Sequence, residues 1–173
     1  MTWGRHFALA ALLAAVLLFC IFVLANAAAA ATIRCPDDGT PTNGRCDGTP
    51  GPDLIWGTNG SNYIFGHGGT DEIYGRGQSD LILGGAGGDV LFGGYGRDDL
   101  RGEGGGDLLT GGSQTDYLYG GKGDDEVWAG GDGFVDYLNG DAPWLFSGGT
   151  DTCYFDRRDH ENGCERRVTG RVA

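Results

Sequence analysis

Residues 84–92 read GGAGGDVLF, and this pattern returns every nine residues in nine consecutive blocks from residue 48 to residue 128. The first position of every block is glycine, and the fourth is glycine in seven blocks, with Gln78 and Gln114 as the exceptions. Glycine adopts positive φ and allows close backbone approach, as tight turns between short strands require. The blocks begin at Gly48, Gly57, Gly66, Gly75, Gly84, Gly93, Gly102, Gly111 and Gly120.

The eighth position of every block is a branched aliphatic residue: Ile55, Ile64, Ile73, Ile82, Leu91, Leu100, Leu109, Leu118 and Val127. We expect it at the centre of a three-residue strand and pointing inward, because neighbouring strand residues face opposite sides. One such residue per block is a thin core, so two blocks must form one coil with a sheet on each side, and coils must stack. The sequence predicts an all-β fold, a right-handed parallel β-roll of two sheets.

The sixth position is aspartate in eight blocks and asparagine in one, and stacking puts every second one directly above another. Carboxylates roughly 5 Å apart repel one another, so counterions are needed. Calcium fits because it takes about six to eight oxygen ligands in flexible geometry, whereas zinc prefers nitrogen and sulfur and magnesium needs strict octahedral geometry. We expect several calcium ions, with side-chain ligands Asp53, Asn62, Asp71, Asp80, Asp89, Asp98, Asp107, Asp116 and Asp125.

The pattern resembles the G-G-x-G-x-D-x-U-x repeats of the RTX, or haemolysin-type calcium-binding, proteins. Residues 84–92 and 120–128 match it throughout. The resemblance implies that each ion lies between same-edge turns of successive coils, with the weakest gap beside the uncharged amide of Asn62. It also implies ligands among second- and fourth-position backbone carbonyls, those of Gly69, Arg76, Gly85, Gly87, Gly94, Gly96, Gly105, Gly112, Gly121 and Gly123.

Composition agrees with a periodic, cation-binding chain. There are 36 glycines but only 5 prolines in 173 residues, without the three-residue period of collagen. The net charge is −12, with 24 acidic and 12 basic residues, which argues against nucleic acid as a partner and for cations.

The first 31 residues are typical of a signal peptide, with Arg5 and His6 before an apolar run from Phe7 to Leu24. We expect cleavage after one of residues 27–31, which would remove Cys20 and leave a secreted, extracellular chain. An uncleaved segment, which would anchor the chain at the cell surface, is the alternative.

Four cysteines then remain, an even number that indicates disulfides in an exported chain. The stack would hold its two ends roughly 20 Å apart, whereas a disulfide needs Cα atoms within about 7 Å. We therefore predict Cys35 paired with Cys46 and Cys153 paired with Cys164, each closing one end.

The repeat resumes irregularly after Trp128. Skipping two residues places Asp136 at a sixth position, as a tenth metal ligand, and Leu138 at an eighth, and a last repeat would put Cys153 in the core. We expect four parts: a signal peptide at 1–31, an N-terminal disulfide cap at 32–47, the calcium-binding β-roll at 48–139 and a C-terminal disulfide cap at 140–173. The caps would stop further stacking.

No constellation of catalytic residues is apparent. His160 and Glu161 do not continue into a zinc-protease motif, and the glycine strings lack the strand-to-helix context of phosphate loops. Nothing beside the repeats is large enough for the protease, lipase or toxin domain that members of the resembled family often carry. We predict a structural calcium-binding module and no enzyme; the alternatives are a remnant or accessory domain of a secreted hydrolase or toxin, or an adhesion or ice-binding module.

Outward-facing ninth positions of alternate blocks form one row, Trp56, Tyr74, Phe92, Thr110 and Trp128. Aromatic residues favour strands on propensity alone. A row this apolar on a solvent face is also typical of a surface that binds a protein or glycan partner or associates with itself.

Overall fold

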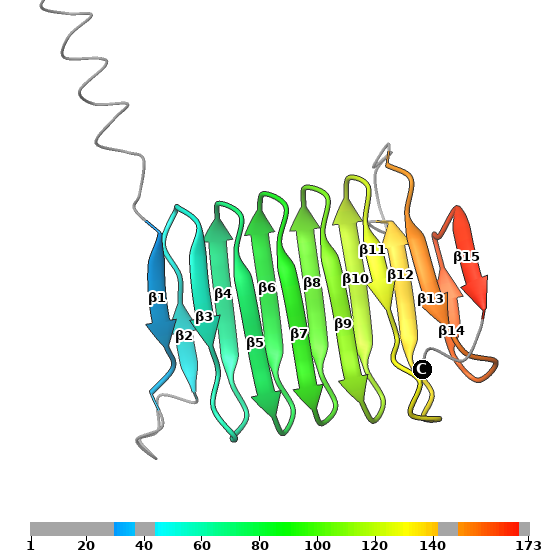
Figure 1. Cartoon of the computed structure of the whole chain (residues 1–173), viewed down its shortest axis with the longest axis horizontal. Helices are drawn as coiled ribbons and strands as arrows, with labels where there is room; N and C mark the ends of the chain where they lie inside the picture. Colours follow the sequence, from blue (N-terminus) through cyan, green and yellow to red (C-terminus); the bar gives the residue numbers. More distant parts are fainter. Residues whose placement is uncertain (1–29, 37–43, 142–148, 170–173) are drawn as a thin grey trace, which may run out of the picture.

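The computed structural model describes residues 30–36, 44–141 and 149–169, all of them in strands, turns or loops (Figure 1). The signal segment expected at residues 1–31 lies almost entirely outside this range. None of the described residues belongs to a helix that could span a membrane. The strands are β1 (Ala31–Arg34), β2 (Arg45–Asp47), β3 (Asp53–Trp56), β4 (Tyr63–Gly68), β5 (Glu72–Gly77), β6 (Leu81–Ala86), β7 (Val90–Tyr95), β8 (Asp99–Gly104), β9 (Leu108–Ser113), β10 (Tyr117–Lys122), β11 (Glu126–Trp128), β12 (Tyr137–Asp141), β13 (Thr152–Phe155), β14 (His160–Asn162) and β15 (Arg166–Thr169).

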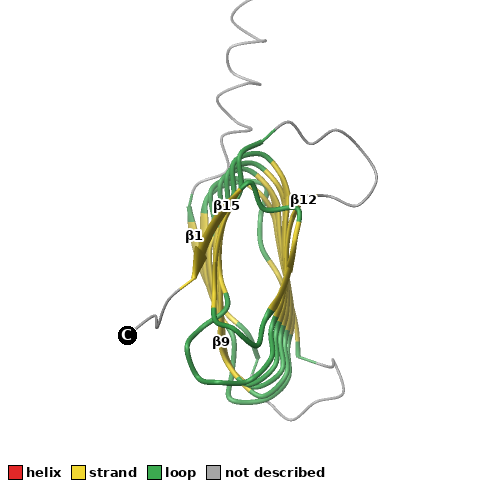
Figure 2. Cartoon of the chain, turned by 90° about the vertical axis from the view of Figure 1, so that its right-hand side faces the viewer, coloured by secondary structure: helices red, strands yellow, loops and turns green. Residues whose placement is uncertain are grey.

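Two parallel sheets stack face to face, as the sequence predicts. The odd-numbered strands form an eight-stranded sheet from β1 to β15, and the even-numbered strands form a seven-stranded sheet from β14 to β2. The chain alternates between the sheets at every turn, so the fold is a β-solenoid of about seven coils. Figure 2, seen along the stack, shows two flat layers of strands joined by superposed turns at both edges.

Consecutive coils in the repeat region pair in a register of eighteen residues. Ile73 of β5 lies beside Leu91 of β7, and Ile82 of β6 lies beside Leu100 of β8. Every eighth-position aliphatic from Ile55 to Val127 has 0% of its surface exposed. One aliphatic per strand therefore suffices for a core, because each is covered by its neighbours in the stack and by the opposite sheet.

The irregular continuation beyond Trp128 belongs to the same stack. Leu138 of β12 pairs with Leu118 and is 2% exposed, and Asp136 is 1% exposed, which confirms the tenth turn. Beyond residues 142–148, which lie outside the described range, Cys153 of β13 pairs with Val127 and occupies the core position predicted for it.

Both predicted disulfides are present. Cys35–Cys46 and Cys153–Cys164 each join residues eleven apart, with Cα–Cα distances of 5.3 and 5.9 Å. The ends are more regular than the expected loops, because β1 pairs with β3, β2 with β4, and β13 with β15. All four half-cystines lie in the buried core. Cys46 and Cys153 take the place of an aliphatic residue beside Ile64 and Val127. Their partners Cys35 and Cys164 lie just beyond β1 and β14.

Candidate metal centre

Seven turns share one backbone conformation, and we call them the interior turns: those that begin at Gly66, Gly75, Gly84, Gly93, Gly102, Gly111 and Gly120. In each of them the second and fourth residues have positive φ, between 61° and 137°. Five of these fourteen positions hold residues other than glycine, namely His67, Arg76, Gln78, Glu103 and Gln114. Positive φ costs such residues energy, so the turn geometry overrides local preference there.

The sixth-position side chains of the interior turns point into the stack and are almost fully buried. Asp71, Asp89 and Asp98 are each 1% exposed, and Asp116 is 0% exposed. Their burial follows from the sequence, because the first position of each turn is glycine. A Cβ on Gly84 would collide with Oδ2 of Asp89, and the same holds at Gly66, Gly75, Gly93, Gly102 and Gly111.

A ladder of hydrogen bonds links these side chains along each edge of the roll. The backbone N–H of Asp71 donates to Oδ1 of Asp89 at 2.8 Å, and that of Asp80 donates to Oδ1 of Asp98 at 2.8 Å. The same bond recurs at 2.8–2.9 Å from Asp89 to Asp107, Asp98 to Asp116, Asp107 to Asp125 and Asp116 to Asp136. Each carboxylate thus bridges to the previous coil through one oxygen.

The other oxygen of six interior carboxylates lacks a hydrogen-bond donor. Oδ2 is buried without a hydrogen-bond partner in Asp71, Asp80, Asp89, Asp98, Asp107 and Asp116. A buried anionic oxygen without a donor is costly, and native proteins rarely leave one unsatisfied. A cation or a proton at each of these oxygens would relieve that cost.

Backbone carbonyls of the same turns face the next coil. A Cβ on Gly85 would collide with the carbonyl oxygen of His67, and one on Gly87 with the carbonyl oxygen of Gly69. The same second- and fourth-position contacts recur farther along: Gly94 against Arg76, Gly96 against Gln78, Gly105 against Gly87, Gly112 against Gly94, Gly121 against Glu103 and Gly123 against Gly105. The space between successive turns is thus bordered by carbonyl oxygens as well as carboxylates.

Burial raises the pKa of the interior carboxyls more strongly than the N–H donor from the previous coil lowers it. The pKa is raised to about 6 for Asp71 and Asp98, to about 7 for Asp80 and Asp107, and to about 8 for Asp116. Like-charged neighbours in the stack raise the pKa of Asp80 and Asp107 further. Without a cation, the buried ladder therefore favours protons on these groups.

This donor set fits calcium. The described residues contain no cluster of three or more His, Cys, Asp or Glu side chains able to hold a metal. A cation between the turns would therefore take most of its ligands from backbone carbonyls. A hard cation that accepts carbonyl and carboxylate oxygens in flexible geometry meets that condition, and a zinc site does not.

The ten predicted side chains lie along the two edges in the expected order. One edge carries Asp53, Asp71, Asp89, Asp107 and Asp125, and the other carries Asn62, Asp80, Asp98, Asp116 and Asp136. The ladder extends to two residues that the sequence reasoning missed. Asp151 accepts from the N–H of Asp125 at 3.0 Å, and Asp159 accepts from that of Asp136 at 3.1 Å. The signal for Asp151 was available, because it stands two residues before the core cysteine Cys153.

The predicted aromatic row forms on the outer face of the eight-stranded sheet. The ring centroids of Trp56 and Tyr74 are 4.2 Å apart, and those of Tyr74 and Phe92 are 4.9 Å apart, in both cases nearly parallel. The register places Thr110 between Phe92 and Trp128, and beyond it Trp128 stacks on Tyr154 at 3.8 Å. Because the rings cover one another's faces, mainly their edges meet solvent.

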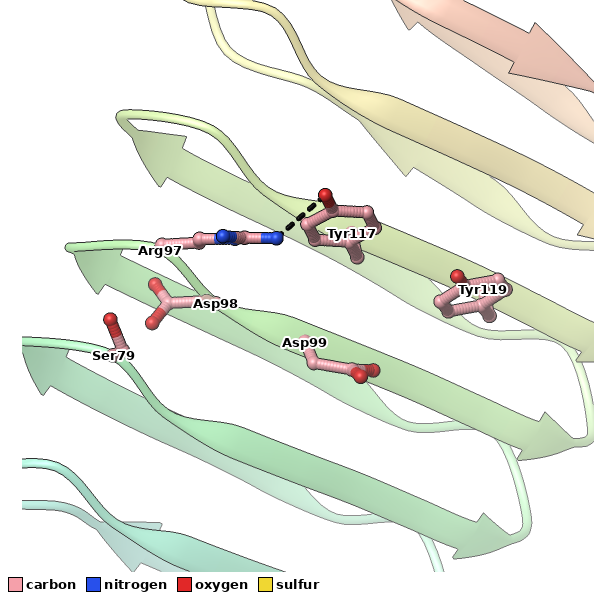
Figure 3. A pocket seen from close by; sticks show the side chains of 6 residues that line it. All are labelled: Ser79, Arg97, Asp98, Asp99, Tyr117 and Tyr119. Atoms are coloured by element: carbon pink, nitrogen blue, oxygen red, sulfur yellow. Dashed lines mark hydrogen bonds between the residues drawn. The ribbon is translucent and has the colours of Figure 1, made fainter.

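The seven-stranded sheet carries a shallow depression of about 440 Å³ (Figure 3). Arg97 donates to the hydroxyl of Tyr117 at 2.7 Å and lies over its ring, and Asp98 of the carboxylate ladder borders the same space. Ser79, Asp99 and Tyr119 complete the lining. Arg101 donates two hydrogen bonds of 2.9 Å to the carboxylate of Asp99.

A family model for the RTX calcium-binding nonapeptide repeat matches the chain in five overlapping stretches, residues 47–82, 74–109, 83–118, 102–133 and 110–142. Neither the comparison with curated proteins nor the comparison with solved structures found a match.

Proposed function

Because the chain belongs to the RTX calcium-binding nonapeptide repeat family, we propose that it is a secreted calcium-binding structural module whose folding is coupled to calcium. Repeats of this family bind Ca²⁺, several ions per array. The single observation that carries the proposal is the row of buried Oδ2 atoms without a hydrogen-bond donor along both edges of the roll.

We assign the ions to the gaps between same-edge interior turns. Sixth-position carboxylates of two successive turns border each gap, as Asp71 and Asp89 do, together with second- and fourth-position carbonyls such as those of His67 and Gly69. This arrangement supports most of the predicted carbonyl set and adds His67, Gln78 and Glu103, whose carbonyls occupy equivalent places.

Coupling to folding follows from where the carboxylates are. In the unfolded chain each aspartate is solvated. The roll buries the sixth-position carboxylates in two rows and leaves Oδ2 of six of them, from Asp71 to Asp116, without a hydrogen bond. Free energy of calcium binding that is available only to the stacked form adds directly to its stability.

Export is supported by the two disulfides, which persist in oxidising compartments, and by the apolar N-terminal segment. We therefore place the mature chain outside the cell, with cleavage after one of residues 27–31 and disulfide caps that flank the roll. The β-roll is a structural calcium-binding fold, and we propose a structural rather than an enzymatic role.

A calcium titration followed by far-ultraviolet circular dichroism tests this function. The oxidised chain in chelator should lack most of its β-signal and gain it cooperatively as calcium rises, whereas magnesium at equal concentration should not restore it. A full β-spectrum in chelator, unchanged by calcium, contradicts the proposal.

The stacked aromatic row supports a second, weaker role in binding a protein or glycan partner or another copy of the chain. Its edges are continuous across Trp56, Tyr74 and Phe92 and resume at Trp128. Replacing Trp56 and Trp128 with Ser should lower self-association in sedimentation velocity or binding to a glycan array. Unchanged results in both measurements rule this role out.

A further inference from the structure

The two turns that precede the interior turns have a different conformation, although they fit the same repeat. We call the turns that begin at Gly48 and Gly57 the N-terminal turns. Their second residues are Thr49 and Thr58, and among the described residues neither these nor the fourth-position Gly51 and Gly60 have positive φ. From the Gly66 turn onward, every second and fourth residue through the Gly120 turn has it.

In this conformation the second residue of the turn donates hydrogen bonds to the sixth-position side chain. The backbone N–H of Thr49 donates to Oδ2 of Asp53 at 2.5 Å, and its hydroxyl donates to Oδ1 at 3.1 Å. The N–H of Ala31 donates to the same Oδ1 at 3.0 Å. Both oxygens of this carboxylate are thus satisfied within the chain.

The Gly57 turn repeats the arrangement with an amide. The N–H of Thr58 donates to Oδ1 of Asn62 at 2.7 Å, and the Asn62 amide group lies 3.2 Å from the Thr58 hydroxyl. That hydroxyl also accepts from the N–H of Gly60 at 3.0 Å. Asn62 carries no charge, so this turn has no anion for a cation to neutralise.

Resting on the function proposed above, we infer that the N-terminal turns are closed by threonine in place of calcium. The first two coils then form a metal-independent template on which the calcium-dependent coils stack. Hydrogen bonds donated by Thr49 and Thr58 satisfy the sixth-position side chain in these turns, as a cation does in the interior turns.

The packing of this end supports a template that holds without metal. Coil one, β1 and β2, pairs with coil two, β3 and β4, in both sheets. The Cys35–Cys46 disulfide ties the two strands of coil one together and packs in the same core as Ile55 and Ile64. A disulfide stabilises a small domain mainly by constraining its unfolded chain.

The template would also give assembly a direction. The sixth-position N–H of each coil donates to the sixth-position carboxylate of the next coil. The template supplies the first two donors to the interior turns, from Asp53 to Asp71 and from Asn62 to Asp80. A pre-formed first edge removes part of the nucleation cost that a repeat array otherwise meets.

Hydrogen exchange of the full oxidised chain, read by mass spectrometry in calcium and in chelator, tests the inference. In chelator, amides of β3 and β4 should exchange at least about tenfold more slowly than those of β7 to β10, which should exchange like an unfolded chain. Equal and fast exchange in both segments overturns the template while leaving the proposed function intact. Slow exchange of β7 to β10 in chelator instead contradicts the calcium coupling on which the template rests.

A conversion variant tests the threonines themselves. Replacing Thr58 with Gly together with Asn62→Asp gives that turn the interior sequence, so bound calcium should rise by about one ion per chain and β4 should lose its protection in chelator. Thr70→Gly, at an exposed threonine of the next turn on the other edge, is the matched control and should change neither. An unchanged ion count in the double variant, with β4 still protected in chelator, overturns the role of Thr58.

Discussion

Carboxylates inside the roll and those near its ends occupy equivalent places in the coil but meet different donors. Inside, Asp89 and Asp98 use one oxygen to accept from the previous coil and leave the other without a hydrogen bond. Near the N-terminus, Asp53 accepts from Thr49 through both oxygens. Near the C-terminus, Asp159 accepts from the N–H groups of Asp136 and Asp156.

The difference shows that one sequence column serves two purposes. In the aspartate turns Oδ1 accepts from the previous coil, and this bridge does not require metal. At Asn62 the oxygen instead accepts from Thr58 of its own turn. The conformation of the turn differs with the φ of its second residue. If the proposed function holds, a carboxylate with an unsatisfied oxygen belongs to a turn that binds calcium, and a satisfied one belongs to a turn that holds without it.

The largest expected effect separates an interior carboxylate from an end one. Asp107→Asn removes the charge of an oxygen that has no hydrogen bond, so calcium titration should shift its folding midpoint to higher calcium by roughly tenfold or more, about 1.4 kcal/mol per tenfold.

Asp53→Asn is the matched control for this change, because it reproduces the arrangement of Thr58 with Asn62. Its midpoint should move far less, as measured by circular dichroism or by calorimetric binding. Equal shifts of the calcium midpoint in the two variants would contradict the distinction between interior and end turns.

A second prediction concerns pH. Burial raises the folded-state pKa of Asp80 and Asp107 to about 7 and that of Asp116 to about 8, above the ordinary value of 3.8. The metal-free roll therefore binds more protons than the unfolded chain, so its stability is fullest below about pH 4 and is lost as pH rises toward 7 or 8.

Acidification should consequently increase the β-signal of the chain in chelator, whereas it should weaken calcium binding, because protons and calcium compete for the same carboxylates. Circular dichroism and calcium titrations at pH 5 and pH 8 measure both. A chelated chain that gains structure as pH rises would contradict the proton linkage.

The smallest expected effect lies in the turns themselves. Gln78 and Gln114 stand at fourth positions with φ of 61° and 80°, where the other interior turns have glycine. Gln78→Gly should raise the stability of the calcium-loaded roll by roughly 1 kcal/mol, because it relieves a left-handed backbone without removing a core contact. Thermal unfolding in excess calcium measures this change in stability. As a control, Gly60→Ala in an N-terminal turn, where φ is not positive, should lower the unfolding temperature less than Gly87→Ala.

Much of this architecture could be predicted from the sequence, because three columns in phase over nine blocks determine the register. The inward aliphatics, the coil of two blocks, the tenth turn at Asp136 and both disulfide pairs follow from spacing and reach. Strict periodicity makes local and long-range preferences agree, so few features of the roll depend on tertiary contacts that the repeat does not specify.

The remaining features depend on contacts that a repeat pattern does not record. Thr49 and Thr58 look like ordinary departures from glycine at the second position, and only their hydrogen bonds to Asp53 and Asn62 reveal a different turn. Spacing alone also misses how the C-terminal end continues the sheets, because Glu161 stands beside Leu138 in β14, where the repeat has an aliphatic residue.

Because successive strands of a sheet are eighteen residues apart, the length of the rod can change only in fixed steps. Duplicating eighteen residues between Gly66 and Trp128 would keep each later strand in its own sheet and lengthen the rod by about 4.8 Å. Duplicating nine would instead transfer every later strand to the opposite sheet, moving the Trp128 and Tyr154 pair to the other broad face. Length can therefore change only in whole coils if the two faces are to keep their identity.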